Sequence, residues 1–286
     1  MSYTALMMDI VNSKKITKDN REELQKYIKT CLLVLNKLFR PSLEFDVIFS
    51  AGDEFQGLFA NPYSAFMYFR LLKMILYPLK IRCGIGVGDW EVRINDGTSS
   101  EQDGSAYHYA RNAIQETEAM EGHNVLLDSN DNNDFLINTL LNASIHLTGM
   151  QSDYQSEISF IVELLNPLLD STGMDQDSFK DLLKLYISKD LKLFSTKKDM
   201  NFNMRYDNRF EVCEVNPINI FPDIIKNQKI YLESNIRKGI PTQISSITGT
   251  TRQNIDSMLK RANTAVIRNI DLTIILYLYK NFQGES

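Results

Sequence analysis

Two aspartates occupy positions at which a strand and a turn bring carboxylates together. Asp9 ends a short apolar strand over residues 3–11, and Asp53 lies at the tip of a hairpin with strands at 45–49 and 55–59. Such paired hard oxygens suit Mg²⁺ or Mn²⁺ with a nucleoside triphosphate, because these ions fill their remaining positions with phosphate and water. We therefore expect Asp9 and Asp53 to be metal ligands. Taken alone, each has a plain alternative, as a strand end or as part of a Gly-Asp turn.

The residues after Asp9 could hold phosphate. Residues 10–13 predict a strand-to-helix turn, whose free backbone N–H groups and helix dipole attract anions. The residues expected to contact the nucleotide are Asn12, Ser13, Lys14 and Gly52. Gly52 also supplies the unusual φ of the hairpin turn. The alternative is an ordinary N-terminal turn with solvated lysines.

The elements that position these residues alternate between strand and helix. After the strand at 3–11, the spacing predicts a helix to about Phe39, the hairpin, a helix over 62–77, a strand over 80–87, a helix over 106–120 and a short strand over 124–127. This order predicts an α+β domain with a βαββαβ skeleton, in which antiparallel strands carry helices on one face.

The rest of the chain predicts mainly helices. The polar run at 128–134 is the most linker-like segment, so we expect a palm domain over 1–130, a helical connecting region over 131–224 and a helix-turn-helix domain over 225–286. Helical patterns lie at about 135–148, 155–170, 176–195, 242–248, 252–263 and 265–280. Residues 201–215 alternate well enough for either a strand or an extended crossing segment.

Three segments resemble the class III nucleotidyl cyclases. Residues 8–13 (MDIVNS) are similar to their DIVxST segment, residues 51–55 (AGDEF) to their GDxF turn and to the GGDEF turn of diguanylate cyclases, and residues 82–88 (RCGIGVG) to their RxGIGxG strand. The combination of MDIVNS, GDEFQGL and GxAYHxAR with a carboxy-terminal helix-turn-helix resembles the bacterial SatD family. That resemblance implies a palm-like, ferredoxin-like cyclase fold joined to a DNA-binding tail.

The resemblance also assigns roles to single residues. Asp9 and Asp53 match the two metal-binding aspartates, with the Ile10 backbone beside the metal, and Glu54 matches the glutamate of the diguanylate-cyclase turn. Phe49 stands four residues before Asp53, where class III cyclases usually place a base-reading lysine. A phenyl ring has no ammonium group with which to recognise a purine edge. The sequence therefore does not predict which nucleotide base is bound.

His108 and Arg111 stand near the asparagine and arginine of the family's GxxVNxAxR pattern. His108 replaces the asparagine, and Arg111 comes one position early. With Gln115 they share one helix face, which could meet phosphate held by the partner subunit of a homodimer. Arg111 would stabilise charge on the phosphoryl oxygens, and His108 would assist by hydrogen bonding or proton transfer. The alternative is a solvated face with an incidental histidine.

The carboxy-terminal tail is basic. Residues 225–286 hold nine Lys or Arg and four acidic residues, whereas the whole chain carries a net charge of −5. Within this tail, residues 244–262 predict a short amphipathic helix, a glycine turn and a capped second helix, which is a helix-turn-helix pattern. In a major groove, bases would be approached by Thr251, Arg252, Gln253 and Asn254, and phosphates by Lys260, Arg261 and Arg268. A packing or dimerisation module is the alternative.

The composition is that of a soluble cytoplasmic protein. Apolar stretches fall far below the ~20 residues that cross a bilayer, so no membrane partner is expected. The three cysteines form no CxxC pair, and the chain has no GxSxG, HExxH or Walker lysine. Two hypotheses follow: a dimeric, metal-dependent enzyme that converts a nucleoside triphosphate to a cyclic nucleotide, or a DNA-binding regulator whose palm domain is a non-catalytic nucleotide sensor or dimerisation module.

Overall fold

The computed structural model describes residues 2–13, 16, 18–120, 124–169, 175–189, 213–226 and 235–282. Its first half confirms the predicted order of strands and helices. The elements are β1 (Tyr3–Ile10), α1 (Lys18–Leu38), β2 (Leu43–Ala51), β3 (Glu54–Phe59), α2 (Pro62–Leu76), β4 (Ile81–Gly88), α3 (Ser105–Ala119) and β5 (Val125–Asp128). Short 3-10 turns, η2 (Arg40–Ser42) and η3 (Ser99–Glu101), precede β2 and α3.

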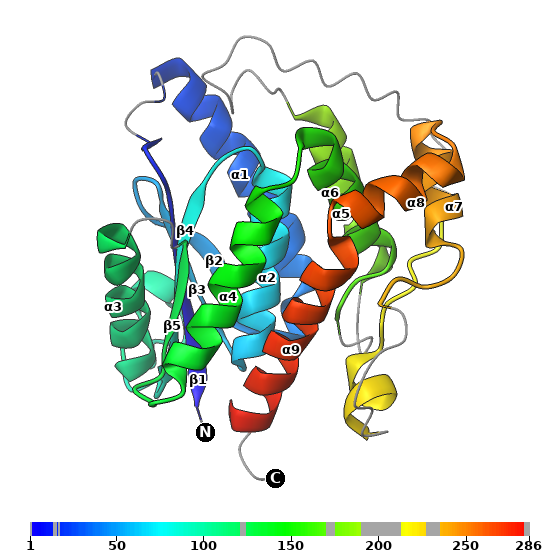
Figure 1. Cartoon of the computed structure of the whole chain (residues 1–286). Helices are drawn as coiled ribbons and strands as arrows, with labels where there is room; N and C mark the ends of the chain where they lie inside the picture. Colours follow the sequence, from blue (N-terminus) through cyan, green and yellow to red (C-terminus); the bar gives the residue numbers. More distant parts are fainter. Residues whose placement is uncertain are drawn as a thin grey trace.

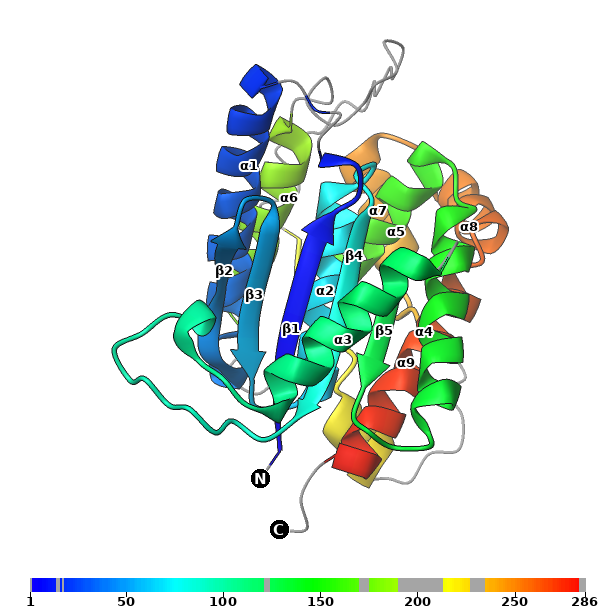
Figure 2. The same cartoon turned by 90° about the vertical axis from the view of Figure 1, so that its left-hand side faces the viewer.

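The strands form one five-stranded sheet in the order β2-β3-β1-β4-β5 (Figure 2). β1 pairs antiparallel with both β3 and β4, whereas β5 runs parallel to β4. Leu6 and Met8 of β1 belong to the large core beneath α1 and α2, whereas Ala5 and Met7 pack with Ala106 of α3. β1 is therefore buried on both faces, which explains its nearly continuous apolar sequence.

Helices cover both faces of the sheet, and the expectation of helices on one face is wrong. α3 crosses in front of the sheet in Figure 2, and α1 and α2 lie behind it. The glycines of β4 make this possible, because an ideal Cβ on Gly86 would lie 2.1 Å from Ala106 O, and one on Gly84 would lie 2.1 Å from Ala110 O. The backbone of α3 thus rests directly on β4.

The free edge of β5 is closed by side chains of α4 (Asp134–Gly149). Asn138 accepts a hydrogen bond from Leu127 N at 2.6 Å and donates one to Leu127 O at 2.8 Å. One helical turn later, Asn142 donates to Val125 O at 2.8 Å. These amides replace a neighbouring strand, so this sheet edge is not open to pairing with another chain.

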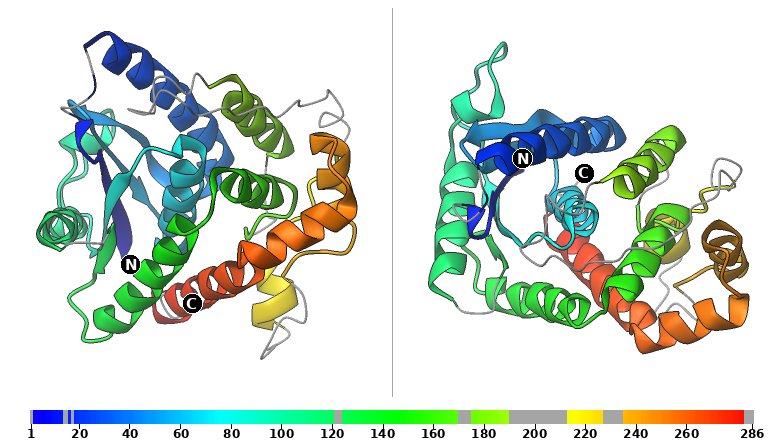
Figure 3. Two further views of the ribbon diagram at one scale, coloured as in Figure 1. Left: turned by 45° about the horizontal axis from the view of Figure 1, so that its top comes forward. Right: turned by 90° about the horizontal axis from the view of Figure 1, so that it is seen from above.

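The second half of the described chain is helical. It comprises α4, α5 (Asp153–Leu165), α6 (Gln176–Ser188), a π-helical turn η6 (Phe221–Lys226), α7 (Ile240–Thr248), α8 (Arg252–Arg261) and α9 (Thr264–Phe282). These helices lie on the side of the sheet opposite α3 (Figures 1 and 3). One continuous core of buried apolar residues joins them to the sheet. The segment predicted as a strand or crossing segment falls largely on 201–212, outside the described residues, and the three-domain division stays a prediction.

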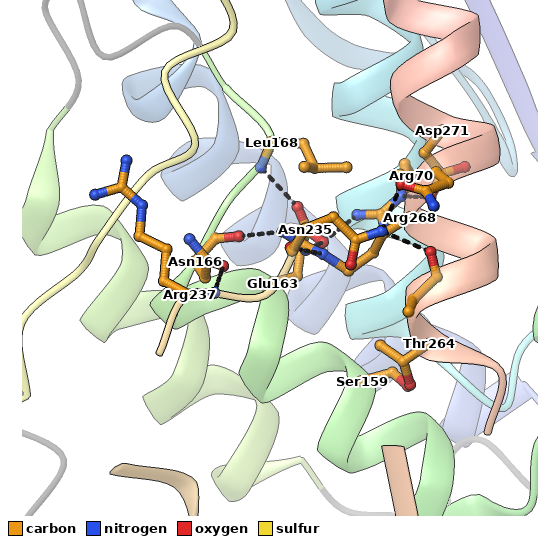
Figure 4. Close-up of polar contacts among 12 residues, drawn as sticks. Arg70, Ser159, Glu163, Asn166, Leu168, Asn235, Arg237, Thr264, Arg268 and Asp271 are labelled. Carbon is orange, nitrogen blue, oxygen red and sulfur yellow. Dashed lines mark hydrogen bonds and ion pairs between the residues drawn. The ribbon is translucent and has the colours of Figure 1, made fainter. Parts of the chain in front are cut away.

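A buried ion network joins α2, α5 and α9 (Figure 4). Arg70 of α2 contacts Asp271 at 2.6 Å and Glu163 at 2.7 Å. Arg268 of α9 donates to the same Glu163 carboxylate at 2.5 Å and to Asn166 O at 2.6 Å. The prediction that Arg268 approaches DNA phosphates is wrong, because its side chain is only 1% exposed and is satisfied inside the protein.

None of the helices in the described ranges has the length and apolar character required to span a membrane.

Candidate functional site

A cavity of about 170 Å³ opens on the α3 face of the sheet, beside the ends of β1 and β3. Its polar lining comes from four elements: Asp9 of β1, Ser50 of β2, Glu54 and Gln56 of β3, and Arg111, Gln115 and Glu118 of α3. The pairing register of β1 and β3 explains why Asp9 and Glu54 lie close together. Met8 pairs with Phe55, so continuing the antiparallel ladder places Asp9 beside Glu54 on the same face.

Asp9 is held by an arginine that follows it across the sheet. Arg82 is the register partner of Asp9 on β4, and its guanidinium donates to the two carboxylate oxygens at 2.9 and 2.7 Å. Arg82 also contacts Glu118 of α3 at 2.9 Å. The hydrogen bond to Asp9 raises the pKa of Arg82 above its ordinary value, and both carboxylates add to the effect by their charge. Asp9 is thus oriented and its charge is balanced.

The two acidic residues of the hairpin have different places. Gly52 adopts a left-handed φ of 60°, as the turn requires, and its carbonyl accepts from Gln25 at 3.0 Å. Asp53 lies at the tip and is not among the residues that line the cavity, whereas Glu54 is. In the described part of the chain, the Glu54 carboxylate has no hydrogen-bond or ion-pair partner.

Of the two predicted catalytic residues, one lies in the cavity and the other outside it. Arg111 lines the cavity and makes no side-chain hydrogen bond or ion pair with any described residue. His108, one turn earlier on α3, is 71% exposed and lies 3.4 Å from Asp103, outside the cavity. The shared face predicted for His108, Arg111 and Gln115 therefore reaches the cavity only through its second and third members.

The predicted phosphate turn is only partly available. Val11 N–H already donates to Lys80 O at 2.9 Å, and α1 begins at Lys18, so the expectation of free N–H groups at a helix start is wrong for this residue. Asn12 has a left-handed φ of 60° and is exposed, and Ser13 follows it. Ile10 is buried and, like both of these residues, does not line the cavity. Lys14 lies outside the described residues.

Phe49 belongs to the core. Its ring packs edge-on against Phe55 at 5.4 Å between centroids, on the face of the sheet covered by α1 and α2. A lysine at this position would be directed into apolar side chains. The position at which the resemblance leads us to look for a base-reading lysine is therefore used for packing in this chain.

The predicted helix pair of the tail is present, as α7 and α8 joined at Gly249, whose φ is 67°. Thr251 caps α8 by accepting from Asn254 N at 3.3 Å, as predicted for a capped second helix. Gln253, Lys260 and Arg261 are exposed, and Arg252 lies 3.6 Å from Asp256. Nothing in this geometry tests whether the helix contacts DNA.

Three carboxylates line the cavity, and the two on neighbouring strands, Asp9 and Glu54, are the ones we consider as ligands of a cation, since Glu118 on α3 is paired with Arg82. Among the described residues, no three His, Cys, Asp or Glu side chains gather as a metal site would require. Asp9 and Glu54 supply hard oxygens, and a nucleotide would have to supply most of the other ligands, as is usual for Mg²⁺. The donor set therefore fits a metal bound together with phosphate, and does not fit a metal bound by the protein alone.

Two charged residues of this site are not predicted from the sequence, Arg82 and Glu118. The signal for Arg82 was present, because alternation along β4 places it on the same face as Gly84 and Gly86, beneath α3. Glu118 lies seven residues after Arg111, two helical turns along the same face.

Comparison with known proteins gives one family. The sequence model of the SatD family matches residues 3–208. A search of curated proteins finds no match. Among solved structures, the chain is similar to one described as "Structure of a bacterial light-regulated adenylyl cyclase", with 15% identity, a TM-score of 0.33, and coverage of 44% of this chain and 74% of that chain.

Proposed function

We propose that this chain, which belongs to the SatD family, binds a nucleoside triphosphate together with Mg²⁺ or Mn²⁺ in the cavity beside Asp9. One observation carries the proposal: the carboxylates of Asp9 and Glu54, beside that of Glu118, line the same cavity as Arg111, a cation with no partner in the described chain. An anionic, metal-bound ligand needs both kinds of group.

Arg111 is the phosphate-binding side chain in this proposal. Its guanidinium can donate two parallel hydrogen bonds to phosphate oxygens, an arrangement that also stabilises charge developing on a transferring phosphoryl group. Arg82 lies behind Asp9 and fixes the carboxylate orientation through its two hydrogen bonds. Asp9 and Glu54 would hold a divalent cation, which would supply neutralisation of the phosphate charge and polarisation of the phosphoryl group.

A second copy of the chain completes the site in this proposal. A cavity of about 170 Å³ is smaller than the ~300 Å³ at which small-molecule sites begin, so it accommodates only part of a nucleotide. The cavity is bounded by one sheet face and α3, and the base and ribose would be held by the partner subunit of a homodimer. Conversion of the triphosphate to a cyclic nucleotide is the finer proposal and depends on this dimer.

The test is a thermal-shift series on the full-length protein with Mg²⁺ or Mn²⁺ and each of ATP, GTP, CTP and UTP. A ligand that binds the native state raises the midpoint of unfolding. We expect a shift with at least one nucleotide, dependent on the metal and lost in Asp9→Asn, and chromatography of the incubated nucleotide then shows whether a cyclic product forms. Absence of a shift with all four nucleotides would contradict the proposal.

The exposed face of α8 favours a second function, DNA binding. Lys260 and Arg261 are exposed in its last turn and have no ion-pair partner among the described residues. Fluorescence anisotropy with a labelled DNA duplex of random sequence would measure binding by the full-length chain. We expect affinity to fall steeply with added salt and to decrease in Lys260→Ala/Arg261→Ala, but not in Lys26→Ala, whose charge lies on α1.

A further inference from the structure

A second cavity, of about 270 Å³, lies on the opposite side of the sheet from Asp9. Its walls are formed by α2, α9, the turn before β2 and the segment around η6. Figures 1 and 3 show α2 and α9 side by side on the face opposite α3. This cavity is therefore separate from the proposed nucleotide site.

The lining is mostly apolar and aromatic, with Ser42, Asn61 and Ser64 as its small polar residues. Tyr63 of α2, Phe221 of η6 and Tyr279 of α9 form one wall, with 4.7 Å between the ring centroids of Phe221 and Tyr279 and 6.0 Å from each to Tyr63. Met67 and Ile275 contribute aliphatic surface. None of the lining residues that the structure describes is charged. A ligand buried here has to be uncharged, because no group offsets the cost of removing a charge from water.

The most deeply buried polar side chain of the lining is that of Ser64. Ser64 is 5% exposed, and its backbone N–H donates to Asn61 Oδ1 in the cap of α2. Its hydroxyl lines the cavity and makes no hydrogen bond within the described part of the chain. The hydroxyl oxygen itself is not fully buried, so it is open to the cavity. Ser64 is thus placed to donate to, or accept from, a single polar group of a ligand.

We infer that this cavity binds a small uncharged molecule with an apolar body and one hydroxyl or carbonyl group, which Ser64 recognises. An apolar cavity of about 150 Å³ holds benzene, so 270 Å³ has room for about ten non-hydrogen atoms. The aromatic wall favours a planar ring system, which packs against ring faces and edges. The ligand contacts helices from both halves of the chain, α2 and α9.

The probe is 1-naphthol, an uncharged two-ring alcohol that is fluorescent, titrated into the full-length protein. We expect saturable binding, seen as a change of probe fluorescence and a rise in the midpoint of thermal unfolding. Naphthalene, which lacks the hydroxyl, should bind more weakly, and 1-naphthoate, which carries a charge, should not bind. Absence of saturable binding by both 1-naphthol and naphthalene, or equal binding of 1-naphthoate, would overturn the inference.

Two variants test whether the probe binds in this cavity. Ser64→Ala should weaken 1-naphthol binding about threefold to tenfold, the value of one hydrogen bond, and leave naphthalene binding unchanged. Leu169→Trp adds a ring at a half-buried position of the wall and should abolish binding of both probes. The control is Ser99→Ala, which removes a buried hydroxyl near α3 and should change neither affinity. Unchanged 1-naphthol binding in both Ser64→Ala and Leu169→Trp would overturn the assignment.

Discussion

At the scale of single residues, the candidate site depends on which acidic side chains reach the cavity beside α3. Asp9, Glu54 and Glu118 do, and the first two lie together on the α3 face because the β1–β3 register aligns them. The sequence could predict Asp9 and Arg111, since their types and spacing suffice. It could not show which of Asp53 and Glu54 lines the cavity. That depends on the residue at which strand pairing resumes after the turn at Gly52.

Substitution of these adjacent carboxylates separates their roles. Glu54→Gln should weaken metal-dependent nucleotide binding by about tenfold or more, because it removes one of the two carboxylates proposed to bind the metal. Asp53→Asn is the matched control, one residue away on the hairpin tip, and should bind within about twofold of wild type. Equilibrium binding in Mn²⁺ measures both, and a larger loss in Asp53→Asn would reassign the ligand.

A buried carboxyl on α5 gives a pH-dependent stability. Burial raises the pKa of Glu157 to about 8, although the charge of nearby Lys189 opposes the shift. A carboxyl whose folded pKa lies above its unfolded value contributes stability at low pH that is lost as the pH rises toward 8. The pKa of Lys189 is itself lowered by burial to about 7, so the wild-type profile contains an opposing contribution.

Glu157→Gln isolates the carboxyl contribution. Between pH 5.5 and pH 8, we expect wild type to lose at least about 1 kcal/mol of unfolding free energy relative to this variant. Urea denaturation of both proteins at the two pH values measures the difference. A constant difference would mean that Glu157 keeps the same protonation state across this range.

At the scale of elements, α3 is positioned by the glycines of β4. The alternation of strands and helices could be predicted from apolar periodicity, and the elements appear in the predicted order. The sheet face that α3 covers could not be predicted. A helical pattern shows which side of the helix is apolar, but not which face of the sheet that side packs against. The spacing of Gly84, Gly86 and Gly88 held that information, since only glycine permits this approach of a helix backbone.

Gly86→Ala should displace α3. Its Cβ would lie 2.1 Å from Ala106 O and 2.2 Å from Ala110 N, both backbone atoms that cannot move without the helix. We expect a loss of about 1–3 kcal/mol in unfolding free energy, and weaker nucleotide binding because Arg111 moves with α3. Gly149→Ala, where an added Cβ meets nothing within 4 Å, is the control and should change stability by less than about 1 kcal/mol.

At the scale of the whole molecule, the carboxy-terminal helices are fixed to the sheet. Arg70, Glu163, Arg268 and Asp271 form a buried ion network between α2, α5 and α9, and Ser144 of α4 donates to Asp271 at 2.6 Å. Sequence periodicity could predict these helices, but it could not predict the network, because its members are up to 201 residues apart. The sequence also predicts that Arg268 approaches DNA, because a basic side chain in a basic tail is expected to be exposed. Its partner Glu163 on α5 could not be foreseen from the sequence.

Removal of one charge from the network should be costly. Arg268→Met leaves Arg70 as the one cation between the buried carboxylates of Glu163 and Asp271, and we expect a loss of about 3–5 kcal/mol in unfolding free energy. Asp256→Asn breaks the exposed contact with Arg252 on α8 and should cost less than about 1 kcal/mol. Denaturant unfolding of both variants measures this contrast, and similar small losses would show that the network contributes little.

The most direct measurement for the proposed nucleotide site is calorimetric titration of the full-length protein with the nucleoside triphosphate that gives the largest thermal shift, in the presence and absence of Mn²⁺. Wild type should bind only with the metal. Arg111→Met should lose about tenfold or more in affinity, the value of charge-assisted hydrogen bonds to phosphate, whereas Arg261→Met on α8 should match wild type. Equal affinities for wild type and Arg111→Met would contradict the assignment of this cavity to the nucleotide.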